Sequence, residues 1–332
     1  MSKSDKFKVG LTRDLLTPAG EPSFGAAALQ VLNANPAIDW EYLPESVSRI
    51  TPDIMARYDG LYVNSPLVDA SAVARDDCRV RIVARHGVGF DSVDVKALAA
   101  RGILTTNTPV AVRRPVAVAA LTQIFALAGR LFAKDRITRQ DRWNERTGHM
   151  GLGLTTRTLG VVGAGGIGRE FLALARPFGW KMLACDPFVD AASLDALGAQ
   201  QVSLEQLLAQ SDFVVMMTLL DARTRHLIGP AQLALMKPQA YLVNIARGPV
   251  VDELALIDAL RAGRIAGAAL DVFEQEPVAP DNPLLSMDNV ILTPHALCWT
   301  DECFDAIARE GLGCIVDFSL GRRPASVVPA PA

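Results

Sequence analysis

A glycine-rich stretch directly after an apolar run limits the fold of this chain more than any other feature. Gly163, Gly165 and Gly168 form a G-x-G-x-x-G pattern between the apolar residues 159–162 and a helical pattern over residues 169–176. The first glycine permits a tight turn, the second lets the backbone approach a pyrophosphate, and the third lets the helix pack on the strand. The pattern alone also occurs in ordinary glycine-rich turns. The prediction of a dinucleotide-binding loop therefore depends on the strand before the glycines and the helix after them.

Short apolar runs alternate with helical patterns along most of the chain, which predicts an α/β fold with parallel sheets and helices on both faces. In the first hundred residues we expect strands at 7–11, 40–43, 61–64 and 80–84, with helical pattern at 25–32 and 95–100. From residue 158 we expect six stronger strands, at 159–162, 181–185, 213–217, 240–245, 268–273 and 289–292. Six strands with intervening helices suffice for a complete doubly wound dinucleotide-binding domain of the Rossmann type.

The chain is long enough for two domains, at 332 residues. A long apolar helix is expected after Pro109, and Pro115 is tolerable there because it falls in the first turn. The residues after Pro294 are too few for a domain of their own, so we expect them to return to the first domain. The predicted domains are residues 1–106 with 297–332, and residues 107–296, with a cleft between them.

Composition indicates a globular protein without a nucleic-acid or membrane partner. The net charge is −3, and the charged opening residues contain no signal-peptide core. The apolar stretch 116–133 contains Gln123 and Arg130, which favours a buried helix over a membrane span. Five cysteines without framework spacing fit reduced thiols in a cytoplasm, and no cysteine or histidine cluster has metal-ligand spacing. We therefore expect a cytoplasmic protein without a metal site.

Asp186 ends the second strand after the glycine loop. A carboxylate at this point accepts hydrogen bonds from the ribose hydroxyls and repels a 2′-phosphate, so the sequence predicts NAD rather than NADP as cofactor. The alternative is an ordinary solvated acid at a strand end.

Three charged residues lie just beyond predicted strand ends: Arg247, Glu276 and His295. The carboxyl ends of parallel strands are where such folds bind ligands, so these side chains are expected to converge. A guanidinium matches the two oxygens of a substrate carboxylate, and a histidine can donate a proton to a carbonyl oxygen near neutral pH. A carboxylate on the other ring nitrogen stabilises the imidazolium. Singly, the three are also explained as a surface charge, a loop acid and a core histidine.

These segments, together with Arg85 to Asp91 and Asp94, resemble the D-isomer-specific 2-hydroxyacid dehydrogenases, from about Val80 to Glu302. The resemblance implies a flavodoxin-like substrate domain beside the Rossmann domain, and a homodimer joined through the cofactor domains. It implies an NAD-dependent enzyme that interconverts a small 2-oxo acid and its D-2-hydroxy acid. Arg247 would bind the substrate, His295 would be the acid/base and Glu276 its partner, with Asp271 near the nicotinamide amide.

The expected binding residues follow from the same motifs. For the cofactor they are Gly163, Gly165, Gly166, Ile167, Gly168, Asp186, Ala246 and Asp271, and for the substrate Arg85, Val88, Gly89, Arg247 and Trp299.

The chain departs from the family pattern at two places near these residues. Met217, Thr218 and Leu219 stand where the family often has His-x-Pro, which bears on cofactor affinity rather than on chemistry. Leu297 and Cys298 replace the common small Gly-Gly pair after His295, so we expect a reshaped substrate pocket.

Two other functions remain open at this point. A non-enzymatic, NAD(H)-responsive binding protein of the corepressor type would keep the same trio, but usually carries a long polar extension. A formate dehydrogenase would have glutamine where Glu276 stands. Arg113 and Arg114, next to an expected helix N-terminus, either point to solvent or pair with acids across a dimer interface, or one of them meets a second anionic group on the substrate.

Overall fold

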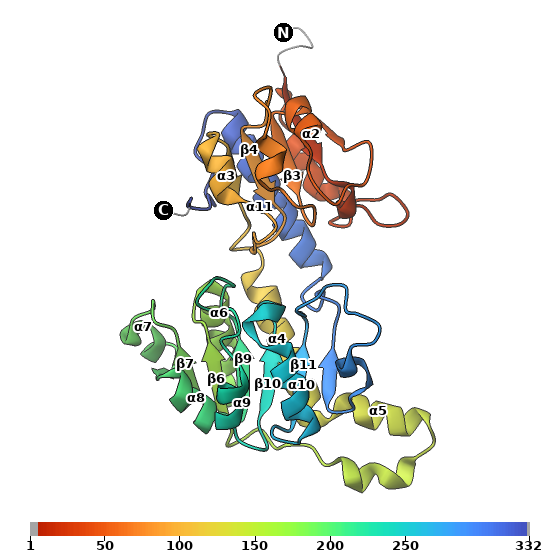
Figure 1. Ribbon diagram of the computed structural model, residues 1–332, viewed down its shortest axis with the longest axis vertical. Helices are drawn as coiled ribbons and strands as arrows, with labels where there is room; N and C mark the ends of the chain where they lie inside the picture. Colours follow the sequence, from red (N-terminus) through yellow and green to blue (C-terminus); the bar gives the residue numbers. More distant parts are fainter. Residues whose placement is uncertain (1–5, 331–332) are drawn as a thin grey trace. The chain divides into compact units, whose positions relative to one another are not determined.

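The computed structural model describes residues 6–330 and divides into two compact units (Figure 1). The first unit runs up to Val112 and resumes at Trp299, and the second spans Arg113 to Cys298. These divisions fall a few residues later than the boundaries expected from the sequence, at 106/107 and 296/297. The charged opening, on which the expectation of a missing signal peptide rests, lies largely outside the described residues.

The first unit is built on a five-stranded parallel sheet with the order β2-β1-β3-β4-β5. One face packs against α2 and α3, with Leu61, Val63 and Val83 pointing into that core. The other face packs against α11, which brings Leu312 against Tyr62 and its neighbours. The elements are β1 (Phe7–Leu11), β2 (Ile38–Tyr42), α2 (Pro52–Arg57), β3 (Gly60–Val63), β4 (Ile82–Arg85), α3 (Val95–Ala100), β5 (Leu104–Thr106) and α11 (Asp301–Ser319).

The second unit is built on a seven-stranded parallel sheet with the order β12-β11-β10-β9-β6-β7-β8. Its strands are β6 (Thr158–Val162), β7 (Lys181–Cys185), β8 (Ala199–Gln201), β9 (Phe213–Met216), β10 (Tyr241–Asn244), β11 (Gly267–Leu270) and β12 (Val290–Leu292). Because β6 lies between β9 and β7, the strand order reverses at the loop that follows β6, where ligands bind in such sheets. This is the predicted Rossmann-type α/β arrangement.

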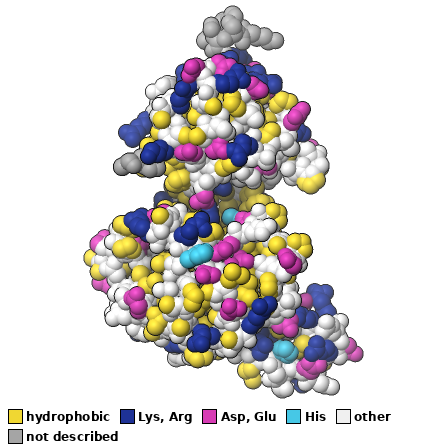
Figure 2. Space-filling model, viewed as in Figure 1, with side chains coloured by type: hydrophobic (Ala, Val, Ile, Leu, Met, Phe, Trp, Pro, Cys, Tyr) yellow, Lys and Arg dark blue, Asp and Glu magenta, His cyan; other side chains and the backbone are white. Residues whose placement is uncertain are grey.

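Helices cover both faces of the second sheet (Figure 1). One core joins the sheet to α4 and α6, and the other joins it to α8, α9 and α10. The helices are α4 (Arg113–Gly129), α5 (Leu131–Arg139), α6 (Gly166–Ala175), α7 (Ala191–Asp195), α8 (Leu204–Gln210), α9 (Pro230–Leu235) and α10 (Glu253–Arg261). Figure 2 shows basic and acidic side chains mixed over the visible surface of each unit.

The sequence-based expectation of one apolar helix over 116–133 is corrected by a break at Arg130, which adopts the left-handed conformation with φ 50°. The first part, α4, is largely buried, with Ala117, Ile124 and Leu127 in the core beneath the sheet. Among the described residues no single helix is long and apolar enough to cross a membrane, and α4 and α5 reach that length together only across a bend of 57°.

Three short elements were not expected, and β11 ends three residues earlier than expected. β5, α2 and β8 have only three to six residues, too few for a hydrophobic period to be recognised. β11 ends at Leu270 rather than at 273. The Asp271 N–H still donates to the Asn244 carbonyl at 3.0 Å, while the Asp271 side chain binds the loop after β12.

Candidate active site

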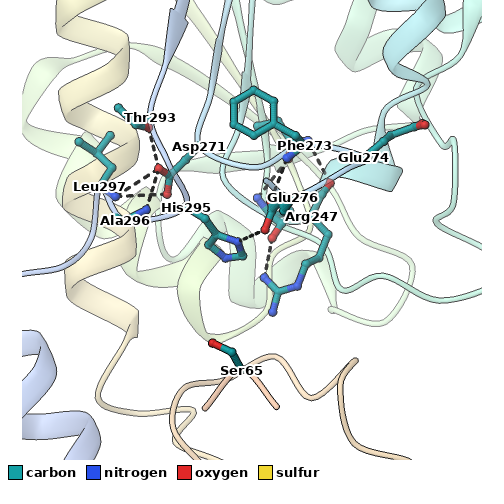
Figure 3. A network of polar contacts seen from close by, with 12 residues as sticks. Ser65, Arg247, Asp271, Phe273, Glu274, Glu276, Thr293, His295, Ala296 and Leu297 are labelled. Atoms are coloured by element: carbon teal, nitrogen blue, oxygen red, sulfur yellow. Dashed lines mark hydrogen bonds and ion pairs between the residues drawn. The ribbon is translucent and has the colours of Figure 1, made fainter. Parts of the chain in front are cut away.

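Three neighbouring strands of the second sheet deliver the predicted catalytic residues to one edge. β10, β11 and β12 are parallel and in register, with Asn244 beside Leu270 and Leu270 beside Leu292. The chain therefore leaves the sheet at three adjacent points, and Arg247, Glu276 and His295 follow within a few residues of these exits. Figure 3 shows the three side chains gathered in one group.

Arg247 is positioned by the turn after β10. The side-chain oxygen of Asn244 accepts a hydrogen bond from the Ala246 N–H at 3.1 Å, and its Nδ2 donates to the Arg247 carbonyl at 3.0 Å. The guanidinium Nη1 donates to the carbonyl of Ala246 at 2.7 Å. The backbone under Arg247 is thereby fixed by a buried asparagine that the sequence analysis did not single out.

Gly248 lets this turn approach the segment after β11. A Cβ atom at position 248 would lie 1.9 Å from the carbonyl carbon and oxygen of Phe273 and 2.4 Å from the Glu274 nitrogen. These neighbours are backbone atoms, which cannot rotate away, so glycine is required here. The close approach brings the Arg247 turn and the Glu276 segment together.

Asp271 holds the loop that carries His295. It is almost completely buried, and its Oδ1 accepts hydrogen bonds from the Thr293 hydroxyl at 2.6 Å, the Ala296 N–H at 3.1 Å and the Leu297 N–H at 3.2 Å. His295 lies between these anchored residues with a positive φ of 52°. The sequence predicts Asp271 near the nicotinamide amide. In the structure its side chain also anchors the loop that carries His295, which the sequence did not indicate.

His295 and Glu276 form a direct pair. Nδ1 of His295 lies 2.8 Å from Oε2 of Glu276, and the other carboxylate oxygen accepts the backbone N–H of Phe273 at 3.0 Å. The His295 side chain is 43% exposed and that of Glu276 38%. A ligand can therefore reach the pair, while both oxygens of the carboxylate are held by hydrogen bonds.

The pKa of Glu276 lies below its ordinary value. Burial acts against this shift and raises the pKa, but the hydrogen bonds from His295 and from the Phe273 N–H lower it, and the charges of His295 and Arg247 lower it further. Glu276 is consequently ionised at neutral pH. A carboxylate on Nδ1 favours the protonated imidazole and leaves Nε2 to contact a ligand. The arrangement can therefore donate a proton from Nε2 to a ligand whose carboxylate binds the neighbouring Arg247 guanidinium.

The glycine loop after β6 has the geometry that a dinucleotide needs. Gly163 has φ +95°, and a Cβ there would lie 2.7 Å from the Thr218 nitrogen. A Cβ at Gly168 would lie 2.2 Å from the Gly163 carbonyl oxygen, which is the close helix–strand packing predicted for the third glycine. At Gly165, in contrast, no atom lies within 4 Å of a Cβ position, and the backbone φ is −67°. The fold does not need glycine there, whereas a ligand resting on the backbone does.

The N-terminus of α6 and Asp186 complete this cradle. α6 begins at Gly166, so the N–H groups of Gly166 and Ile167 belong to the first turn, which lacks intrahelical acceptors and carries a partial positive charge. Oδ2 of Asp186 accepts the Ala164 N–H at 2.7 Å, and Oδ1 accepts the Phe188 N–H at 2.8 Å. Each oxygen keeps a lone pair for a ribose hydroxyl. These residues fit NAD.

In the first unit, the expected substrate loop follows β4. The Gly87 N–H donates to the Thr108 hydroxyl at 2.9 Å, and Asn107 Nδ2 donates to the Val88 carbonyl at 2.7 Å. Gly87 has φ +116°, and the Arg85 guanidinium occupies the place of its missing side chain. Gly89 is buried.

His86 and Trp299 lie in the same unit. Burial, followed by the charge of Arg85, lowers the pKa of His86 to about 3, so this histidine is neutral. It contacts the Tyr62 hydroxyl at 2.5 Å. Trp299, 56% exposed, packs edge-on against Phe304 with ring centroids 4.9 Å apart.

The sequence-based expectation of no metal site rests on the spacing of the cysteines and histidines. Within residues 6–330, no group of three or more such side chains is placed to hold a metal ion.

Comparison with known proteins identifies the family. The NAD-binding domain of the D-isomer specific 2-hydroxyacid dehydrogenases matches residues 121–296. A glyoxylate reductase of Korarchaeum cryptofilum is 42% identical over 75% of this chain and 76% of its own length. A D-3-phosphoglycerate dehydrogenase of Archaeoglobus fulgidus is 37% identical over 78% of the chain, which spans about half, 48%, of that longer protein.

A crystal structure of a D-lactate dehydrogenase from Aquifex aeolicus, complexed with NAD and lactic acid, superposes with a TM-score of 0.83. It has 26% sequence identity and covers 98% of this chain and 100% of its own. Sequence, fold and site agree: the chain belongs to the D-isomer specific 2-hydroxyacid dehydrogenase family and is an NAD-dependent enzyme that interconverts a small 2-oxo acid and its D-2-hydroxy acid.

Proposed function

We propose that His295 is the acid/base of this dehydrogenase, Glu276 its partner and Arg247 the residue that binds the substrate carboxylate. The observation that carries the proposal is the 2.8 Å contact between His295 Nδ1 and Glu276 Oε2, beside the Arg247 turn. These three residues come from three adjacent strand exits, and none is needed for the core of the sheet.

Reduction transfers a hydride and a proton to the substrate carbonyl. Bound NADH supplies a hydride for C2. His295, protonated and with Nδ1–H donated to Glu276, gives the proton on Nε2 to the carbonyl oxygen as its C=O π bond breaks, and an alcohol results. The imidazole is left neutral and is recharged from solvent. In the oxidative direction the same nitrogen accepts the alcohol proton.

Glu276 acts on the His295 ring, and Arg247 acts on the substrate carboxylate. The Glu276 carboxylate selects the ring orientation of His295 and compensates the imidazolium. Arg247 offers two parallel N–H groups to the substrate carboxylate, which fixes C2 relative to His295. The Gly163–Gly168 loop, Asp186, Ala246 and Asp271 are the proposed cofactor residues, and Arg85, Val88, Gly89 and Trp299 are proposed to contact the substrate.

As substrate we propose a short 2-oxo acid, with glyoxylate as the first to be tested. The support is the 42% identity to an archaeal glyoxylate reductase that this chain matches over three quarters of its length. The phosphoglycerate dehydrogenase relative supports it less, because the chain covers only about half of that protein's length.

The test is a panel of 2-oxo acids followed by NADH absorbance. Glyoxylate, hydroxypyruvate, phenylpyruvate, 2-oxoglutarate and sulfopyruvate are compared by kcat/KM at equal NADH. Glyoxylate or hydroxypyruvate is expected to lead by at least about tenfold, equivalent to 1.4 kcal/mol of transition-state binding. A lead by phenylpyruvate or by a doubly anionic acid would contradict the proposed substrate class and leave the His295 assignment intact.

We also propose that the protein is a homodimer. α5 and the residues after it extend away from the sheet of their own unit (Figure 1). They expose Leu131, Phe132, Trp143 and Met150, which are 52–77% accessible. Exposed apolar groups concentrated on one extension favour burial against a second copy. Light scattering of the wild type should give twice the mass of one chain. The double variant Phe132→Asp/Trp143→Asp should give the mass of one chain. The control Phe188→Asp, at another exposed phenylalanine, should stay dimeric.

A further inference from the structure

Arg113 lies against the first residue of the nucleotide-binding helix. A Cβ atom at Gly166, where α6 begins, would lie 2.8 Å from the Arg113 Nε, 3.3 Å from its Cζ and 3.4 Å from its Cδ. The guanidinium of α4 therefore occupies the space that a side chain at position 166 would fill. Arg113 and Gly166 both belong to the second unit.

The electrostatic setting around Arg113 favours an anion. Arg113 is the first residue of α4, a helix of 17 residues, and it approaches the first turn of α6. Both helix ends carry partial positive charge, which opposes a cation. An anion at the start of α6 interacts favourably with Arg113 and with both helix ends.

Its neighbour Arg114 has a different environment. Nη1 of Arg114 lies 3.0 Å from Oε1 of Glu170, on the next turn of α6. Arg114 thus tethers α4 to α6 through a carboxylate of the same unit. Adjacent arginines of equal charge, both on the α4–α6 contact, therefore provide a matched pair for an experiment.

We infer that Arg113 binds the pyrophosphate of NAD, as a side-chain cation brought to the glycine loop from α4. Gly165 and Gly166 offer backbone N–H groups but no side chain, so the loop itself contributes no full charge to the phosphates. This inference rests on the proposed placement of NAD on the Gly163–Gly168 loop. It replaces the sequence-based hypothesis that Arg113 or Arg114 meets a second anionic group on the substrate, since both arginines lie against α6.

The test measures binding rather than turnover. Titration calorimetry with ADP-ribose, which contains the pyrophosphate, is compared with adenosine, which lacks it. Arg113→Gln, which keeps length and removes charge, should weaken ADP-ribose about ten- to a hundredfold, the usual value of a charged hydrogen bond. Adenosine should be unaffected, and Arg114→Gln should change ADP-ribose binding less than about threefold, as an exposed ion pair predicts.

A rescue variant separates charge at this position from folding effects. In the Arg113→Gln background, Gly166→Arg places a guanidinium stem in the vacated space, and Gly166 has no positive φ that would forbid it. This double variant should recover most of the lost ADP-ribose affinity. Equal losses for Arg113→Gln and Arg114→Gln, equal losses for ADP-ribose and adenosine, or no loss would overturn the inference.

The variant Gly165→Val tests separately whether NAD lies on the Gly163–Gly168 loop. The open space and ordinary φ at Gly165 allow valine without strain, but its side chain would stand where the pyrophosphate rests. If Gly165→Val weakens ADP-ribose and Arg113→Gln does not, the placement holds and the role of Arg113 is wrong. If neither variant weakens ADP-ribose, NAD does not lie on this loop.

Discussion

His295 and Glu276 leave the sheet after different strands, yet Nδ1 of the histidine lies 2.8 Å from Oε2 of the glutamate. The contact depends on two separate backbone constraints. Asp271 anchors the His295 loop through its flanking residues, and the Phe273 N–H fixes the second oxygen of Glu276. Both side chains are therefore oriented before a substrate arrives, which is what an acid/base pair requires.

Loss of the Glu276 charge is expected to change the pH dependence of reduction. With His295 as the proposed acid, reduction needs its protonated ring, so the rate should fall as pH rises. The lowered pKa of Glu276 keeps its carboxylate ionised over the working range, and this charge favours the imidazolium. In Glu276→Gln the imidazolium loses its counter-charge, so the alkaline limb of the kcat/KM profile should move toward acid. The activity should fall about ten- to a hundredfold, as for a lost charged hydrogen bond.

A second histidine–glutamate pair supplies the control for this experiment. Nε2 of His226 lies 2.6 Å from Oε1 of Glu274, two residues before Glu276. Glu274→Gln removes the same charge from the same segment and should leave the pH profile in place. If both variants shift the profile equally, the effect is the general loss of negative charge, and Glu276 is not the specific partner.

Arg247 should tolerate no substitution, including lysine. A lysine keeps the charge but cannot form two parallel hydrogen bonds to a carboxylate. Arg247→Lys is expected to lower kcat/KM for the 2-oxo acid at least about tenfold, with NADH affinity unchanged. Steady-state kinetics and NADH fluorescence titration measure the two quantities. Arg223→Lys, at an exposed arginine paired with Asp221, is the control. A loss below about threefold would remove Arg247 from the carboxylate-binding role, because even one lost charged hydrogen bond should exceed it.

The cofactor preference should depend on the Asp186 charge. Its two oxygens accept the Ala164 and Phe188 N–H groups, so the carboxylate is fixed beside the glycine loop. A 2′-phosphate would approach this negative charge. The wild type should strongly prefer NADH, and Asp186→Asn should narrow the NADH/NADPH ratio of kcat/KM at least about tenfold. Equal use of both cofactors by the wild type, or an unchanged ratio in the variant, would be inconsistent with this role.

Gly248 is expected to be essential for stability as well as for the site. A methyl group there would overlap the Phe273 backbone, and such overpacking typically costs about 1–3 kcal/mol or more. Gly248→Ala should therefore lower Tm by several degrees, at about 2–4 °C per kcal/mol for a unit of this size. Gly165→Ala, where a Cβ meets no atom, should leave Tm unchanged. Similar thermal scans for the two variants would show that the close approach at Gly248 is not needed.

The sequence predicts the larger features of the fold because they are apolar and periodic. The strands beginning at Phe7, Lys181 and Phe213 were expected within one residue of their observed bounds. β8 and β5 were missed because an edge strand such as Ala199–Gln201 carries two glutamines, and Leu104–Thr106 has three residues. The break at Arg130 was also missed, since a left-handed residue inside an apolar helix leaves no periodic signal.

The site could be predicted in part for a related reason. Charged residues after parallel strands are visible in the sequence, and Arg247, Glu276 and His295 do meet. Their supports were not visible, because Asn244, Gly248 and the Phe273 N–H act through backbone contacts between segments distant in sequence. A polar residue at the end of an otherwise apolar strand, as Asn244 is, was the available signal.

The central claim is that His295 transfers the proton at the carbonyl oxygen. The most direct measurement is the single-turnover rate of glyoxylate reduction by enzyme preloaded with NADH, in wild type and His295→Gln. The rate should fall about 10²–10⁴-fold, while the NADH dissociation constant stays within a factor of about three. A turnover rate in His295→Gln close to that of wild type would contradict the account.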